Sequence, residues 1–252
     1  MSPRRLVWNG LRVPFITPWS AERMLPGTIE LRRGRGGVGI GYRDEYSRAD
    51  RWRDALWVRV PARPGVGRPL LDGVHALRQR QAMNHTLCQV CSKSTVGTRR
   101  DERQLFVAGA GSGRPFAEGE PTTTPPLHEL CALEAIRECP HLARGYVASL
   151  VEYTPAWGVA GIVYDPRTLR PLPSGDGEDL TLVEYDDPLI RWTLAARAAV
   201  TLHGCTPVTV TLHGCTPVTV TLHGCTPVTV TLHGCTPVTV TLHGCTPVDF
   251  AA

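Results

Sequence analysis

Short runs of apolar and β-branched residues, separated by glycine-rich or charged turns, dominate the N-terminal quarter of the chain. Three of these runs predict β-strands, at 28–31, 38–42 and 56–60. Apolar positions then recur at helical spacing over 69–83, which predicts a helix with one face in the core. The residues of that stripe are Leu70, Leu71, Val74, Leu77 and Ala82.

The segment that precedes the C-terminal tail alternates strand-like runs with polar turns. Residues 145–153 and 157–164 predict an antiparallel pair around Thr154-Pro155, and 180–185 predicts a further strand. An amphipathic helix is expected over 189–202, because Asp and Pro residues directly before it suit a helix start.

The tail is a perfect decapeptide repeat. TLHGCTPV occurs five times, beginning at 201, 211, 221, 231 and 241, and the copies are joined by Thr-Val. Each unit alternates apolar and polar residues before a Gly-Cys-Thr-Pro break, so the array predicts either a β-meander or a disordered segment. His213 and Cys215 share strand parity and offer soft ligands for a metal, but a passive duplication is the favoured interpretation.

Positive charge is concentrated in the N-terminal third. Residues 1–80 hold 16 Arg against seven acidic residues, whereas 148–200 is acidic. A basic face attracts nucleic acid or acidic protein surfaces. However, Lys93 stands alone against 26 Arg, a skew that codon bias produces without any ligand. The run Arg32–Gly37 resembles an RGG segment, but a single copy between strand-like runs favours a hairpin turn.

No stretch is apolar and long enough for a transmembrane helix, and the N-terminus has no apolar signal core. We therefore expect no membrane association and a cytoplasmic protein. In that reducing compartment, nine cysteines indicate metal ligands or free thiols rather than disulfides.

The sharpest chemical signal is a pair of motifs with metal-ligand spacing. Cys88 and Cys91 form a CxxC pair after the first predicted helix, and His128 and Cys131 are spaced i, i+3 where another helix begins, over 132–139. A tight knuckle and the first turn of a helix together make a treble-clef arrangement, for which 104–108 would supply the β-hairpin. A Cys₃His set satisfies tetrahedral Zn²⁺ with no open position, which predicts a structural site. The alternative is three unrelated thiols and a surface histidine.

Other candidate ligands are weaker. Cys139 and His141 follow the same helix and are kept as spare zinc ligands, although a core thiol beside a helix-ending proline explains them better. The acidic cluster Glu184, Asp186 and Asp187 could bind Mg²⁺, but a helix start needs the same residues.

Known catalytic motifs are absent. The segment 92–127 contains no His, which argues against an HNH nuclease, and His128-Glu129 lacks the second His of HExxH metalloproteases. The deaminase signature is missing as well. The glycine-rich segment 109–113 lacks the GK[ST] ending of a phosphate loop and predicts a flexible hairpin loop.

The motifs CQVC, PPLHELC and RECPHL, with the later DDPLIRWTLAAR, resemble uncharacterised actinobacterial proteins of streptomycete type. Members of that group carry CQVCG, PPxCxxC and CPHL segments, and the likeness covers about residues 28–208. This chain departs from them at His128, where Cys is usual, and at Ser92, where Gly commonly follows the knuckle. The resemblance implies a zinc site and no known activity.

We therefore expect an α+β protein organised around a treble-clef-like zinc site of Cys88, Cys91, His128 and Cys131. It would comprise a basic β-rich region ending in a helix (1–84), the zinc module (85–147), acidic strands with a C-terminal helix (148–204) and the repeat tail (205–252). The first hypothesis for its function is a non-enzymatic binding or regulatory protein that meets nucleic acid or protein through the basic region. The second is an enzyme, or an enzyme's accessory subunit, with its site between the two flanking regions.

Overall fold

The computed structural model describes residues 6–210, apart from 26, 35, 47–48, 112–113 and 175–179, together with the backbone of Val228–Thr229. Its helices are α1 (Ala76–Asn84), α2 (Glu129–Glu138) and α3 (Pro140–Ala143), and Pro188–Trp192 forms the 3-10 turn η1. Its strands are β1 (Val7–Trp8), β2 (Leu11–Arg12), β3 (Ile29–Gly34), β4 (Gly37–Tyr42), β5 (Arg51–Trp52), β6 (Ala55–Trp57), β7 (Gln104–Gly109), β8 (Pro121–Thr122), β9 (Tyr146–Val151), β10 (Ala156–Val163), β11 (Thr181–Glu184), β12 (Thr193–Thr201), β13 (Thr206–Thr209) and β14 (Val228–Thr229). The described chain is thus a mixed protein with several sheets and few helices.

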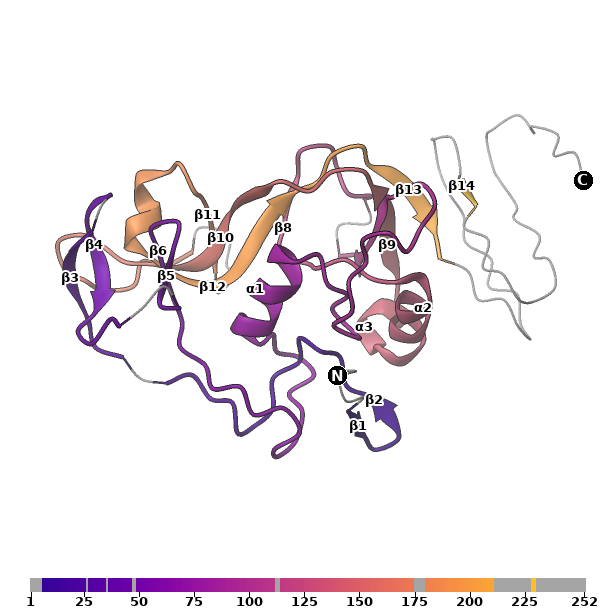
Figure 1. The fold of residues 1–252 in the computed structure, drawn as a ribbon, viewed down its shortest axis with the longest axis horizontal. Coiled ribbons are helices and arrows are strands. Elements are labelled where there is room, and N and C mark those ends of the chain that lie inside the picture. Colours follow the sequence, from indigo (N-terminus) through magenta and orange to yellow (C-terminus); the bar gives the residue numbers. More distant parts are fainter. Residues whose placement is uncertain are drawn as a thin grey trace, which may run out of the picture.

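Two sheets carry most of the structure (Figure 1). The larger has the order β11-β10-β12-β6-β5, with β8 also paired to β12, and the smaller has the order β14-β13-β9-β7. The chain passes directly from the smaller sheet to the larger one between β9 and β10, and back again between β12 and β13. An isolated bridge between Tyr153 and His203 ties these two crossings together. The hairpin β3–β4 turns around Gly34 and Gly37, as the interpretation of the RGG-like run required.

Helix α1 packs against the middle of β12, and a buried glutamine explains its position (Figure 1). One side of β12 pairs with β6 at Leu194 and with β8 at Val200, which leaves the backbone between them without a strand partner. The Gln79 side chain fills that gap, because its Nε2 donates to the Ala198 carbonyl at 2.9 Å and its Oε1 accepts from the Ala198 N–H at 2.8 Å. The amide therefore takes the place of a neighbouring strand.

The helix predicted over 69–83 is shorter than expected and buries a different face. Residues before Ala76 follow an extended path, in which Pro69 bridges to Trp19 and His75 caps the helix. The expected apolar stripe is wrong in part: Ala82 is buried as predicted, but Leu71 is exposed. The polar residues Arg78 and Gln79 are buried instead. These two polar side chains can be buried because both are hydrogen-bonded.

The helix predicted over 189–202 is wrong. Asp187 does cap a helical start by accepting from the Leu189 N–H, but the turn ends at Trp192 and the chain continues as β12. Small alanine side chains let β12 lie between β10 and α1, and pairing along almost the whole of β10 outweighs their helix propensity.

The strands predicted over 145–153 and 157–164 exist as β9 and β10, but they do not pair with each other. β9 lies between β7 and β13 in the smaller sheet, whereas β10 lies between β11 and β12 in the larger one. Thr154-Pro155 is therefore a crossing between sheets rather than a hairpin turn.

The first repeat copy is an integral part of the fold. It supplies Thr201, the last residue of β12, then crosses to the smaller sheet and forms β13. Its Leu202 and Val208 are buried. Beyond residue 210 the structure describes only β14, whose Val228 pairs in parallel with Val208 at the equivalent repeat position. The expectations of a meander, a disordered tail or metal binding at His213 and Cys215 lie outside the described residues.

A buried ion pair fixes the irregular N-terminal segments to α1. The Glu22 carboxylate accepts two hydrogen bonds of 2.7 Å from the Arg78 guanidinium and further ones from the backbone N–H groups of Trp19 and Arg63. Burial opposes ionisation of Glu22, but these bonds outweigh it and hold its pKa below the usual range. The His75 ring lies beside the pair, with its Nε2 atom 3.1 Å from the Pro61 carbonyl oxygen.

We expect His75 to make the protein less stable in mild acid. Burial lowers the pKa of His75 below its ordinary 6.5, so the folded protein keeps the ring neutral while the unfolded chain takes up a proton. The stability that the neutral His75 ring contributes is fully present above pH 6.5. It is lost as the pH falls through the lowered pKa of His75 in the folded protein. In urea unfolding, the His75→Asn variant, which retains a capping oxygen, should lose less stability than the parent between pH 6.5 and 5. Equal losses would contradict this assignment.

Candidate metal centre

The first half of the centre is a tight turn over 88–94. Leu87 and Ser94 form an isolated bridge at its base, and the Cys88 N–H donates to the Lys93 carbonyl at 2.8 Å. The Ser92 N–H in turn donates to the Cys88 carbonyl, which requires a left-handed backbone at Ser92, with φ of 60°. Glycine is favoured in that conformation, so a serine at this position carries a conformational cost.

The second half is the start of α2. His128 is the N-cap residue and Cys131 lies in the first turn, three positions later. Side chains at these two positions share one face of the helix, as the i, i+3 spacing predicts. The Gln89 N–H donates to the Pro126 carbonyl at 3.1 Å, and this bond joins the turn to the segment that leads into the helix.

The four predicted ligands come together. One ligand atom from each of Cys88, Cys91, His128 and Cys131 lies within 4.8 Å of all the others, and Cys91 Sγ is 3.2 Å from His128 Nδ1. Cys88 and Cys131 are buried within an apolar cluster that includes Leu105. Three sulfur atoms and one imidazole nitrogen around a common centre can bind a metal ion.

Neighbouring groups orient these ligands for a metal. His128 Nε2 is 2.9 Å from the Ser94 carbonyl, and a proton on Nε2 leaves Nδ1 free as the ligand atom. The Arg12 guanidinium lies 3.8 Å from Cys131 Sγ and pairs with Glu134 at 2.8 Å. A cation beside a group of thiolates offsets their negative charge.

Hydrogen bonds and burial within the cluster shift the pKa values of its three thiols. A hydrogen bond from the Cys131 thiol lowers the pKa of Cys88 to about 4, and backbone N–H groups of the turn and of His128 add to this effect. The same bond raises the pKa of Cys131, while burial raises the pKa of Cys91. A bound cation requires its cysteine ligands to be thiolates, so metal binding would release protons from this cluster.

The weaker candidates lie apart from this group. Within the described residues, these four side chains form the one Cys, His and carboxylate cluster suited to a metal. The spare ligand Cys139 ends α2, and His141 Nδ1 instead contacts the Arg144 guanidinium at 2.8 Å. Asp187 of the acidic cluster caps η1, which is the helix-start role that its position indicated.

The secondary structure around the centre differs from the expectation in one respect. The strand predicted over 104–108 is present as β7, but it pairs with β9, which follows α2 in the chain, and not with a strand before the helix. Arg12 and Ser94 were not foreseen, because contacts across such a span leave no periodic signal in the sequence.

No protein-family model matches the chain, and no curated protein or solved structure is similar to it. Among the described helices, none has the length and hydropathy needed to cross a membrane. The resemblance to streptomycete-type proteins stays a prediction.

Proposed function

We propose that this chain is a non-enzymatic binding or regulatory protein in which Cys88, Cys91, His128 and Cys131 hold a structural Zn²⁺. The supporting observation is that all four ligand atoms lie within 4.8 Å of one another. Zinc prefers four tetrahedral nitrogen and sulfur ligands at structural sites, and four protein ligands leave no position for a substrate. With Zn–S bonds of about 2.3 Å, the ligand atoms would lie about 3.8 Å apart, which needs only a small contraction.

The ion would link the knuckle directly to α2, and through the knuckle to the N-terminal segment at Phe15 and Ile16. The knuckle receives backbone hydrogen bonds from Phe15 and Ile16, and α2 supplies the other two ligands. We propose a treble-clef-like centre in which β9 provides the partner that β7 lacks locally. Zn²⁺ with three thiolates and a neutral imidazole carries one negative charge, and the Arg12 guanidinium, which also pairs with Glu134, lies beside it.

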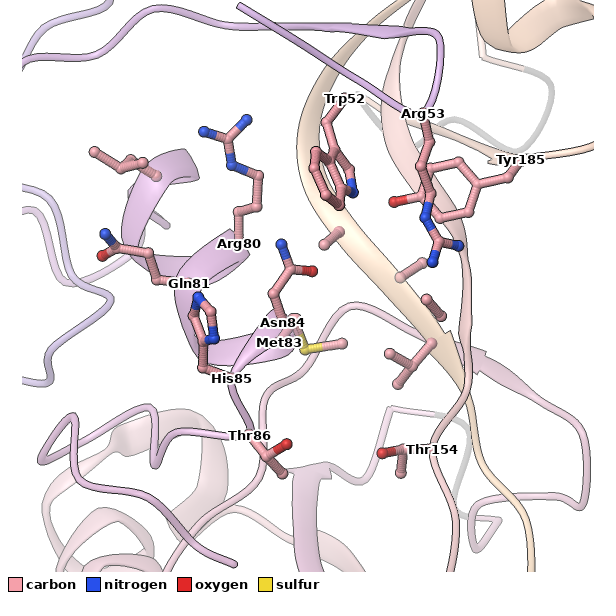
Figure 2. A pocket seen from close by; sticks show the side chains of 15 residues that line it. Trp52, Arg53, Arg80, Gln81, Met83, Asn84, His85, Thr86, Thr154 and Tyr185 are labelled. Atoms are coloured by element: carbon pink, nitrogen blue, oxygen red, sulfur yellow. The ribbon is translucent and has the colours of Figure 1, made fainter. Parts of the chain in front are cut away.

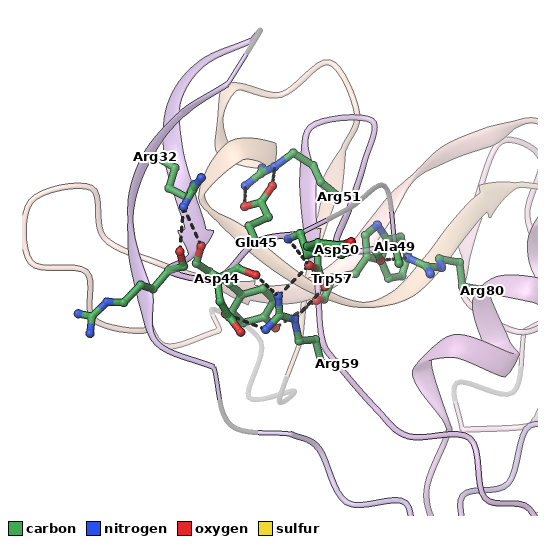
Figure 3. Close-up of polar contacts among 12 residues, drawn as sticks. Arg32, Asp44, Glu45, Ala49, Asp50, Arg51, Trp57, Arg59 and Arg80 are labelled. Carbon is green, nitrogen blue, oxygen red and sulfur yellow. Dashed lines mark hydrogen bonds and ion pairs between the residues drawn. The ribbon is translucent and has the colours of Figure 1, made fainter.

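We propose the basic region as the surface for a nucleic acid or protein partner, but much of its charge is already neutralised. Arg51 pairs with Glu45 at 2.7 Å, and Arg59 pairs with Asp50 at 2.7 Å (Figure 3). Binding through the remaining arginines would weaken steeply with salt if phosphates are the target. Binding to DNA or RNA that is insensitive to salt would argue against this surface.

One observation favours the alternative, an enzyme or an accessory subunit in which zinc is only structural. A cleft of about 580 Å³ is lined by residues from 1–84 and from 148–204, where that hypothesis places a site. Small-molecule sites, including those of enzymes, commonly have this size.

Metal content of the purified full-length protein tests the zinc proposal. We expect one Zn²⁺ per chain by mass spectrometry under native conditions, and chelation should lower the thermal unfolding midpoint, since binding stabilises the folded state. Reduced protein that contains no metal and does not bind added Zn²⁺ would overturn it.

A further inference from the structure

A cleft that contains none of the four metal-ligand residues has polar side chains of α1 on one side and two aromatic residues with an arginine on the other (Figure 2). Arg80, Gln81 and Asn84 project from α1 on one side, and Trp52, Arg53 and Tyr185 face them from the other. Small apolar side chains of β12, from Ala198 to Val200, also line the space. Its volume of about 580 Å³ suits a small organic molecule.

The cleft is positively charged, and no carboxylate side chain lines it. Arg53 and Arg80 are among its lining residues, which include no Asp or Glu. Neither guanidinium forms an ion pair with a carboxylate of the described chain, in contrast to their neighbours Arg51 and Arg59 (Figure 3).

Both arginines instead lie over aromatic rings. The Arg80 guanidinium is 4.5 Å from the centre of the Trp57 ring and makes a long hydrogen bond of 3.4 Å to the Ala49 carbonyl. The Arg53 guanidinium is 4.8 Å from the centre of the Tyr185 ring. Arg80 is half-buried, and this burial lowers its pKa, so its charge is partly desolvated without a compensating carboxylate among the described residues.

The turn between β5 and β6 places Arg53 at a conformational cost. Arg53 and Asp54 both have left-handed backbones, with φ of 48° and 65°, at positions where Asn and Gly are favoured. The hairpin nevertheless presents Trp52 and Arg53 side by side at the cleft, with 46% of Trp52 exposed. The turn therefore brings an exposed aromatic ring and a cation together at the cleft.

We propose that this cleft binds a small planar organic anion, a ring bearing a carboxylate or a phosphate. The guanidinium groups of Arg80 and Arg53 would pair with the anion, because their planar donors match either group. The ring would stack against Trp52 and contact the small apolar side chains of β12. This inference supplies the ligand class of the proposed binding protein and does not depend on which metal the Cys₃His centre holds.

Calorimetric titration of the full-length protein with two pairs of probes tests the inference. The pairs are AMP with adenosine and indole-3-carboxylate with indole, and within each pair only the first carries the anion. We expect at least one anion to bind and its neutral partner to bind at least tenfold more weakly. Binding of AMP alone identifies the phosphate, and binding of indole-3-carboxylate alone identifies the carboxylate. If neither anion binds at millimolar concentration, or if the neutral partners bind equally well, the inference is wrong.

Variants locate the binding. Arg80→Gln and Arg53→Gln should each weaken anion binding at least tenfold, and Arg53 lies on an exposed turn where the change leaves the fold intact. Arg100→Gln, at an exposed position outside the cleft, should have no effect. Unchanged affinity in both cleft variants would overturn the proposed site. Zinc content measured on the same samples separates the two proposals, since a fully zinc-loaded chain that binds neither anion contradicts only the ligand.

Discussion

Replacing Cys131 by Ser is expected to abolish stoichiometric zinc binding and to cause the largest loss of stability of any single change considered. Cys131 is 7% exposed and lies in the first turn of α2, so its sulfur has no substitute nearby in the described chain. A serine hydroxyl is a poor ligand at neutral pH, and three remaining ligands bind Zn²⁺ far more weakly. Apparent free energies of structural zinc binding start at roughly 10 kcal/mol in small peptides, which sets the scale of the possible loss.

Cys139→Ser is the matched control. It makes the same change of sulfur to oxygen one helix length away, at a half-buried position outside the ligand group. We expect this variant to keep one zinc per chain and a thermal midpoint within a few degrees of the parent. Zinc content and thermal unfolding of both proteins check the prediction. If Cys131→Ser retains a full zinc complement, the proposed ligand set is wrong.

The ligand cluster was predictable because its signals are local. The CxxC pair and the i, i+3 pair each fix two side chains within a single turn, so only one long-range contact remained to be assumed. That contact is made by the backbone of Gln89 and Pro126. Arg12 and the Ser94 carbonyl approach the same ligands from distant segments, and no spacing in the sequence indicates them.

Seven of the 14 described strands were predicted, because apolar alternation is a local property, whereas the partners of a strand depend on the whole chain. β9 and β10 are close in sequence, yet they belong to different sheets, where β9 pairs with β7 and β13 and β10 pairs with β11 and β12. The alanine-rich segment 193–201 has good helix propensity by itself, but pairing with β10 decides its conformation. Arg78 and Gln79 were not among the predicted core residues of this helix, because the partners that allow them to be buried come from elsewhere in the chain.

Replacing Arg78 by Met is expected to lower the free energy of unfolding by about 3–5 kcal/mol, the usual cost of removing one partner of a buried ion pair. The Glu22 side chain is 0% exposed and that of Arg78 is 6% exposed, so the remaining carboxylate would stay buried without its cation. Urea unfolding at pH 7 measures the difference.

Two further variants show whether the loss comes from the stranded charge. Adding Glu22→Gln to Arg78→Met removes that charge while keeping an oxygen for the Trp19 or Arg63 N–H, so the double variant should regain part of the lost stability. Arg137→Met breaks an exposed pair with Glu138 and should cost no more than about 1 kcal/mol. If Arg78→Met also lowered the free energy of unfolding by only about 1 kcal/mol, water would have to reach Glu22 in solution. The segments around Trp19 and Arg63 would then be held to α1 by packing rather than by this ion pair.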